Sequence, residues 1–262
     1  MLIDTHCHLD AAEFDDDREQ VVARARDAGV RWMVVPAIGA DNFGKVARVA
    51  ASHPGCAYAL GIHPMYVDRA GDDDLRLLRE SIAAAIGDPL LVAVGEIGLD
   101  FFVPGLDRER QQRFFVEQLA IAREFDLPVL LHVRRSQDVV LKHLRRVRPP
   151  AGIAHAFNGS VQQASGFLDL DFALGFGGAM TFERALRIRG LVRDLPVHAH
   201  VLETDAPDMA PAWRNGSRNS PTELPRIAEV FADLREVTLE EACAQTGRNA
   251  MRVMPRLAAL PG

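Results

Sequence analysis

The stretch LLVAVGEI, residues 90–97, is a short apolar run that a single charged residue, Glu96, interrupts near its end. Runs of this length, rich in Val, Ile and Leu, are typical of strands that are buried on both faces of a parallel sheet. Seven similar runs occur along the chain: LIDTHC from residue 2, RWMVVPA from 31, AYALGI from 57, PVLLHV from 128, AGIAHA from 151, FALGF from 172 and HVLETD from 200. The sequence therefore predicts eight strands.

Segments with helical spacing of apolar residues separate these runs. The clearest cover residues 15–29, 72–87, 107–125 and 160–171, and two more, 221–235 and 238–253, follow the last run. Several begin with Asp or Ser and some end at Gly, the residues preferred at the two ends of a helix. This alternation predicts an α/β fold, a (β/α)8 TIM barrel formed by one domain over residues 1–262. No glycine-rich phosphate loop follows the first run, which argues against an open nucleotide-binding sheet.

The composition is that of an ordinary globular protein. The chain is 48% hydrophobic and 25% charged, with a formal net charge of -6 at pH 7. An acidic chain argues against a protein that coats nucleic acid by bulk electrostatics, but it leaves room for a local basic cleft. The sequence has no signal peptide or membrane-spanning run, and its three cysteines cannot all pair. We therefore expect a cytoplasmic protein with reduced thiols and no membrane partner.

Potential metal ligands are concentrated where the predicted strands end, which is where the active site of such a barrel lies. They are His6 and His8 on the first run, His63 after the third, Glu96 on the fourth, His132 on the fifth, His155 on the sixth and Asp205 on the eighth. Because side chains alternate along a strand, His6 and His8 point to one face and Cys7 to the other. Imidazoles and carboxylates bind divalent metals, and a carboxylate can bridge two ions. One such residue is more often structural, but this set indicates a binuclear centre.

A second His-x-His, formed by His198 and His200, has the same spacing as the first. It precedes its strand, which places it at the N-terminal end of the barrel, where residues serve stability. We therefore predict no metal ligand there, nor at His53 or His143 on helical or loop segments.

At these residues the sequence resembles the TatD family of metal-dependent deoxyribonucleases, within the amidohydrolase-like group of barrels. The resemblance is carried by DTHCHLD, GIHP, VGEIGLDF, the LH and R of LHVRR, HAFNGS, LETDAP, RNSP and TGRNAMRVM, in that order along nearly the whole chain. It implies that His6, His8, Glu96 and Asp205 hold one metal, that Glu96, His132 and His155 hold the other, and that His63 lies near substrate phosphate. Phe101, Met65 and HAFNGS depart from common family patterns and bear on substrate preference.

Two metal ions would make the reaction a hydrolysis by an activated water, with Glu96 bridging the ions and Asp205 as general base or as ligand alone. Arg134 follows His132 by two positions and is predicted to hold a phosphate, whereas Arg135 should point elsewhere if the alternation continues. Trp213, in the loop after the eighth run, is a candidate for stacking a base, and Asn158 for binding substrate. Ser160 is equally suited to cap the next helix. The basic run of Arg145, Arg146 and Arg148 is expected on the opposite face.

The resemblance implies a deoxyribonuclease resembling a 3′–5′ exonuclease, with DNA as substrate and no obligate protein partner. The alternative is a two-metal hydrolase of a small amide, lactone or phosphoester, because the same barrel serves many substrates. A non-catalytic scaffold is disfavoured because all six ligands are present. The cofactor is predicted to be two divalent metal ions, zinc, manganese or magnesium; nitrogen-rich ligands suit zinc, manganese or iron, and magnesium prefers oxygen.

Overall fold

Eight apolar runs form eight parallel strands, each paired with the next in chain order. The computed structural model describes residues 1–260, so the last two residues of the predicted domain lie outside the described residues. The strands are β1 (Leu2–Asp4), β2 (Val30–Pro36), β3 (Cys56–Leu60), β4 (Leu91–Asp100), β5 (Val129–Arg134), β6 (Gly152–Ala154), β7 (Phe172–Phe176) and β8 (His200–Leu202). Each of the eight predicted runs overlaps one of them.

The sheet closes between its first and last strands. The backbone N–H of Thr5, directly after β1, donates to the carbonyl of Leu202 at the end of β8, at 3.1 Å. Further along the same seam, the N–H of Asp205 donates to the carbonyl of His6 at 2.8 Å. The predicted (β/α)8 barrel is therefore confirmed.

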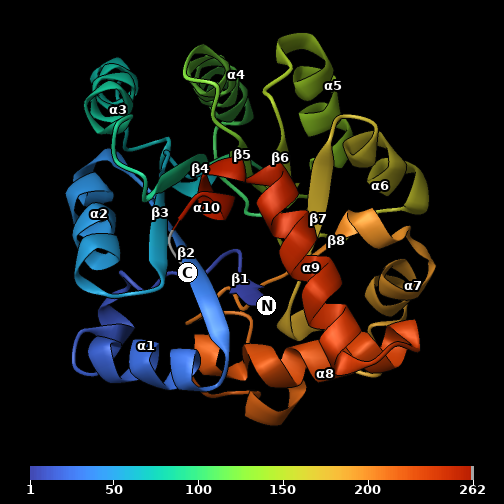
Figure 1. Ribbon diagram of the computed structural model, residues 1–262. Helices are drawn as coiled ribbons and strands as arrows, with labels where there is room; N and C mark the ends of the chain where they lie inside the picture. Colours follow the sequence, from blue (N-terminus) through green and yellow to red (C-terminus); the bar gives the residue numbers. More distant parts are fainter. Residues whose placement is uncertain (261–262) are drawn as a thin grey trace.

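All helices but the last two surround the barrel in chain order (Figure 1). The helices are α1 (Arg18–Asp27), α2 (Phe43–Ser52), α3 (Asp72–Ala85), α4 (Arg108–Glu124), α5 (Gln137–Val147), α6 (Val161–Leu168), α7 (Leu186–Asp194), α8 (Leu224–Arg235), α9 (Leu239–Val253) and α10 (Pro255–Ala258). Their starts follow local chemistry: the side chain of Asp107 accepts from two N–H groups of α4 at 3.0 Å, and Ser160 accepts from the N–H of Gln163 in α6. Among residues 1–260, none of these helices combines the length and the apolar character that a membrane span requires.

The inside of the barrel is a packed apolar core. It is formed by residues that alternate inward along the strands, among them Ile3, Trp32, Val34, Leu130 and Val201. Each buried side chain of this size contributes about 1.5–3 kcal/mol relative to exposure. The two C-terminal helices, α9 and α10, add apolar side chains to this same core.

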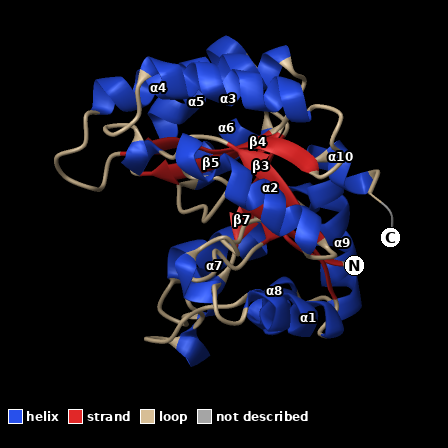
Figure 2. Cartoon of the chain, turned by 90° about the vertical axis from the view of Figure 1, so that its left-hand side faces the viewer, coloured by secondary structure: helices blue, strands red, loops and turns tan. Residues whose placement is uncertain are grey.

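These two helices lie across one opening of the barrel (Figure 1). Seen from the side, α9, α10 and the N-terminus lie at the same end of the molecule (Figure 2). Because the strands begin at this end, it is the N-terminal opening, and it is filled by apolar packing. The chemistry of the site is therefore confined to the opposite end, where the strands finish.

Candidate active site

The first His-x-His lies just beyond β1, at the C-terminal end of the barrel. Strand β1 ends at Asp4, but the alternation continues: the His6 ring is fully buried in the site while Cys7 packs into the core between strands and helices. The carboxylate of Asp4 fixes this segment, because it accepts hydrogen bonds from the N–H and hydroxyl of Thr204 at 2.9 and 2.6 Å and from the N–H of His6 at 3.3 Å. Asp4 thus ties β1 to the segment that follows β8 directly beside the site.

Glu96 lies within β4, not at its end as predicted. The pairing of β4 with β5 shifts register between Val94 and Ile97, and the strand then continues to Asp100. Gly98 pairs with His132 at a φ of +146°, and a Cβ added there would lie 2.0 Å from the carbonyl oxygen of His132. Glycine at this position lets the two backbones approach and places Glu96 and His132 side by side.

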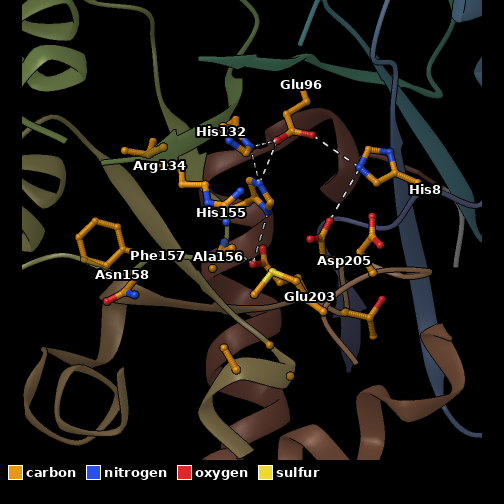
Figure 3. A pocket seen from close by; sticks show the side chains of 18 of the residues that line it. His8, Glu96, His132, Arg134, His155, Ala156, Phe157, Asn158, Glu203 and Asp205 are labelled. Atoms are coloured by element: carbon orange, nitrogen blue, oxygen red, sulfur yellow. Dashed lines mark hydrogen bonds and ion pairs between the residues drawn. The ribbon is translucent and has the colours of Figure 1, made fainter. Parts of the chain in front are cut away.

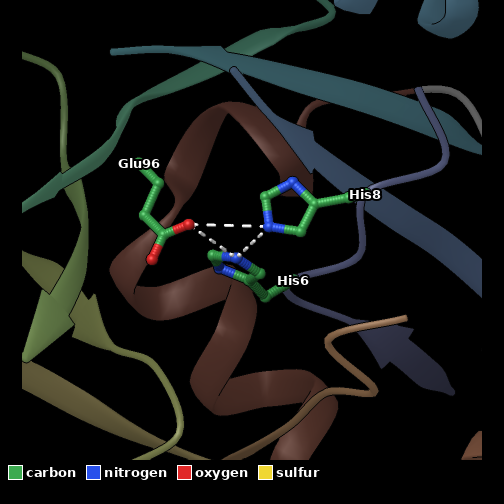
Figure 4. A group of neighbouring side chains, drawn as sticks. All are labelled: His6, His8 and Glu96. Carbon is green, nitrogen blue, oxygen red and sulfur yellow. Dashed lines mark hydrogen bonds and ion pairs between the residues drawn. The ribbon is translucent and has the colours of Figure 1, made fainter. Parts of the chain in front are cut away.

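The two carboxylate oxygens of Glu96 face different sets of histidines (Figures 3 and 4). Oε2 lies 3.2 Å from His6 Nε2 and 3.6 Å from His8 Nε2. Oε1 lies 3.0 Å from His132 Nδ1, 2.9 Å from His155 Nε2 and 3.4 Å from His63 Nε2. One buried carboxylate therefore stands between two groups of imidazoles that come from four strands or the segments that follow them.

Asp205 completes the first group. Its Oδ1 lies 3.7 Å from His6 Nε2 and 3.8 Å from His8 Nε2. Its backbone adopts a φ of +57°, a left-handed conformation that Asp tolerates better than most residues, and its N–H is held by the carbonyl of His6. Three groups of side chains bring ligand atoms close enough to hold a metal ion: His6, His8 and Glu96; His6, His155 and Asp205; His63, Glu96 and His132.

Electrostatics keep the central carboxylate ionised. Burial alone would raise the pKa of Glu96, but the charges of His63, His155 and His6 outweigh it and hold that pKa well below its usual value. Burial lowers the pKa of His6 to about 3, helped by repulsion from His155. At His155 burial acts in the same direction, but attraction to Glu96 overcomes it and raises the pKa to about 10. The histidines of the cluster therefore differ widely in pKa.

The crowding of ring nitrogens fits a site for cations. His6 and His8 bring their Nε2 atoms within 3.3 Å of each other, and Nε2 of His63 lies 3.1 Å from Nδ1 of His132. Lone pairs of neutral imidazoles turned toward each other repel unless a proton or a metal ion lies between them. Five imidazoles and two carboxylates in this arrangement match the ligand preferences of divalent transition metals.

Two further carboxylates support the cluster and were not predicted. Asp100 Oδ2 lies 3.0 Å from His132 Nε2, so it can fix the orientation of this ring. Glu203 is buried, accepts a hydrogen bond from the N–H of Ala156 at 2.5 Å, and places Oε1 3.9 Å from His155 Nδ1. Strand alternation was the available signal, because Asp100 is four residues after Glu96 and Glu203 is two residues before Asp205.

The cluster opens into a cavity of about 1430 Å³. The predicted substrate residues His63, Arg134 and Asn158 line it, and Figure 3 shows Arg134 and Asn158 on the opposite side of it from His8 and Asp205. Ser160 lines the cavity as well, while its side chain caps α6.

The structure differs from the sequence-based expectation at two residues near the cavity mouth. Trp213 is not among the residues that line the cavity; its Nε1 donates to Glu223 at 2.7 Å and the guanidinium of Arg226 covers its ring at 4.1 Å. Arg135 does line the cavity, beside Arg134. Its φ of +54° interrupts the strand alternation that would have turned it away.

The remaining histidines are not part of the cluster. His143 Nε2 lies 3.2 Å from Oε1 of Gln112, and His53 Nδ1 lies 2.9 Å from the carbonyl of Val49 at the end of α2. His200 is buried beside Phe176 and Phe231. The structure thus separates these histidines from the cluster as predicted.

Comparisons with known proteins agree with this architecture. The family model described as TatD related DNase matches residues 3–255. The uncharacterized metal-dependent hydrolase YjjV of Escherichia coli K12 is 40% identical over 240 residues, which cover 91% of this chain and 92% of that protein. The 3′-5′ ssDNA/RNA exonuclease TatD of Pantoea sp. At-9b is 34% identical over 260 residues, covering 96% of this chain and 98% of that protein.

Among solved structures, the crystal structure of the TatD homolog YjjV from Escherichia coli K12 superimposes with a TM-score of 0.93 at 37% identity, and the match covers 99% of this chain and 98% of that one. These matches confirm the resemblance, the barrel fold and the predicted enzyme class, a metal-dependent hydrolase.

Proposed function

This chain belongs to the family of TatD-related DNases, and from that premise we propose that it is a metal-dependent deoxyribonuclease that hydrolyses DNA phosphodiester bonds from the 3′ end. The family match and the relative from Pantoea, a 3′-5′ exonuclease, support this reaction. A location in the reducing cytoplasm fits the three free cysteines.

The observation that carries the proposal is the division of the histidines between the two oxygens of Glu96. His6, His8 and Asp205 with Oε2 of Glu96 would hold one divalent cation. His132 and His155 with Oε1 would hold a second. The nitrogen-rich ligand set favours zinc or manganese over magnesium.

Bound cations would supply a water of lowered pKa and polarise the phosphate. The chain's own groups would do the rest. Asp205, with 14% of its side chain exposed at the cavity, is placed to accept a proton from that water. Arg134 and His63 face the same cavity and can donate to phosphate oxygens. Asp100 holds the His132 ring in place through the contact at 3.0 Å.

A small-molecule hydrolase is the alternative, and the dimensions of the cavity argue against it. Pockets that enclose small ligands typically measure about 300–1000 Å³. The cavity here measures about 1430 Å³, and its wall includes the exposed side chains of Met65, Tyr66 and Phe102. An open mouth with exposed aromatic groups suits a polymer better than an enclosed metabolite.

A timed digest of end-labelled single-stranded and double-stranded DNA with each metal tests the proposal. The expected result is stepwise shortening from the 3′ end by the parent protein and none by His6→Ala purified in the same way. Equal cleavage by His6→Ala would assign the activity to a contaminant. Asp205→Asn with its metal content retained should lose most of its turnover; a near-normal rate would remove its role as base and leave it as a ligand.

A further inference from the structure

The active-site cavity is lined by side chains of both charges. Three arginines, Arg134, Arg135 and Arg187, line it from the end of β5, the loop that follows it and the start of α7, and we call them the arginine rim. Besides Glu203, which supports the ligand cluster, three further carboxylates, Asp10, Glu13 and Asp208, line it from the segments after β1 and β8. In the barrel β1 and β8 are neighbours and β5 stands across from them, whereas β7, the strand before α7, pairs with β8. A polyanion would be repelled by the carboxylates and attracted to the rim.

The charges of the rim are available to a ligand. Arg135 and Arg187 are exposed, and neither has a carboxylate within 4.0 Å anywhere in residues 1–260. Arg134 has one distant carboxylate contact, with Asp100 at 3.9 Å. Some exposed arginines elsewhere, such as Arg76 and Arg79, are instead paired with neighbouring carboxylates.

Phe102 organises two members of the rim. Its ring is 44% exposed and lines the cavity. The guanidinium carbons of Arg134 and Arg135 lie 3.9 and 4.7 Å from the ring centroid. Such cation–π contacts limit the freedom of both side chains before any ligand binds, so less entropy is lost on binding. The left-handed backbone of Arg135 is what brings both guanidinium groups to one ring.

Arg187 has no evident role in stabilising its own helix. It occupies the first turn of α7, which contains no acidic residue. A cation at this end of a helix is unfavourable because the N–H groups there already carry positive partial charge. Its side chain lines the cavity instead, and it therefore adds positive charge to the same cavity as Arg134 and Arg135.

We propose that the arginine rim binds backbone phosphates of a single-stranded polynucleotide on either side of the bond held at the Glu96 cluster. Arg135 and Arg187 contact phosphates that a small ester does not possess, and Phe102 is a positioning residue for Arg135. This inference rests on the proposed nuclease function and extends it from a reaction to a path for the strand. A groove that combines cations with an aromatic ring is the usual means of binding single strands without sequence preference.

Binding of a fluorescent oligothymidylate with hydrolysis-resistant phosphorothioate linkages to the metal-loaded protein tests the rim. Affinity is measured by anisotropy between about 0.05 and 0.2 M salt, because each phosphate contact to a single strand adds about 0.7 to the slope of log K against log salt. Arg135→Gln and Arg187→Gln should each weaken binding several-fold and reduce the slope by about 0.7. Phe102→Leu should weaken binding less and leave the slope nearly unchanged.

The matched control is Arg146→Gln, which removes an exposed arginine near the C-terminal end of α5 that does not line the cavity. It should bind like the parent. Thermal unfolding of the two rim variants should stay at the parent temperature, since both side chains are exposed and without ion pairs.

Rim variants that bind and respond to salt as Arg146→Gln does would overturn the proposal, and so would a parent protein that fails to bind the oligothymidylate. The nuclease function fails separately. If the rim variants lose affinity as expected but the parent never shortens natural DNA, the rim stands and the reaction is wrong. If the parent shortens DNA and the rim variants bind normally, the reaction stands and the rim is wrong.

Discussion

The chain contains two His-x-His stretches with the same spacing and different roles. His6 and His8 lie beyond β1 at the C-terminal end of the barrel, where both Nε2 atoms approach Glu96 within 3.6 Å. His198 and His200 lie at the start of β8, at the opposite end. Here Asn249 of α9 donates to the carbonyls of Val197 and His200 at 2.7 and 2.8 Å. The second pair is thereby tied to the helix that covers the N-terminal opening.

The surroundings of the two stretches explain the difference. His200 is 1% exposed, with the rings of Phe176 and Phe231 at centroid distances of 5.4 and 5.3 Å. Burial lowers its pKa to about 4. His198 is exposed. Spacing alone therefore does not make a metal site; the second stretch lacks carboxylates and imidazoles converging from other strands.

The largest effect on activity should come from removing the carboxylate of Glu96, which lies next to both histidines of the first stretch and to those of the other ligand group. Glu96→Gln replaces a buried charge between two groups of imidazoles, and we expect DNA hydrolysis to fall by well over about 100-fold, beyond the loss typical of residues that only support ligands. His200→Gln should retain the parent rate. Initial rates on end-labelled DNA check this. A similar loss of rate in Glu96→Gln and His200→Gln would mean that the two stretches do not differ in their role.

The second stretch should contribute to the loss of stability at acid pH through His200. The pKa of His200 is about 4 in the folded protein and about 6.5 in the unfolded chain. Between these values the unfolded chain binds the proton and the folded protein does not, so stability is complete above about pH 6.5 and falls as the pH drops toward 4. The loss amounts to about 3 kcal/mol in the free energy of unfolding.

His200→Gln removes the titrating group. Denaturant unfolding at several pH values should show a smaller fall of stability from pH 7 to 4 for this variant than for the parent. If the free energy of unfolding fell equally with pH in the two proteins, burial would not lower the pKa of His200.

A smaller loss of metal affinity or activity is expected from changing Asp100, which contacts the ligand His132 on the other side of Glu96 from the first stretch. Asp100→Asn removes the charge that faces His132 Nε2 at 3.0 Å. We expect a loss of about 10–100-fold in metal affinity or activity, as is typical when the partner of a metal-binding histidine is removed. Competition with a chromophoric chelator measures the affinity, and an unchanged affinity would exclude Asp100 as a positioning residue.

The smallest effect should come from the exposed member of the second stretch. His198→Ala changes a side chain that lies outside the cavity and the ligand groups. Metal content, DNA hydrolysis and melting temperature should all match the parent. A drop in metal content would show that spacing does identify a second site.

The sequence predicts much of this molecule because the fold depends on patterns that are local. Apolar runs locate all eight strands, and ligands placed by their position on those runs converge as expected. Details that depend on backbone irregularities do not follow from the pattern. The register shift after Val94 puts Glu96 inside β4, and the left-handed residue at Arg135 turns its side chain into the cavity.

Long-range partners are the other feature that the pattern does not reveal. Trp213 is predicted to stack a base, and in the structure Glu223 and Arg226, from the segments that follow it, contact its side chain. Glu203 and Asp100 were overlooked although alternation places them beside recognised ligands. Glu203 contacts Ala156, and Asp100 contacts His132. Each contact joins segments that are distant in the sequence, so it cannot be recognised from either segment alone.

We infer that Glu96 divides the histidines around it between two metal sites. Native mass spectrometry of the protein loaded with zinc or manganese tests this by counting bound ions. We expect two ions per chain for the parent, one for His8→Ala and one for His132→Ala, with two retained in His200→Gln. A single ion in the parent, or the loss of both ions from either single variant, would contradict it.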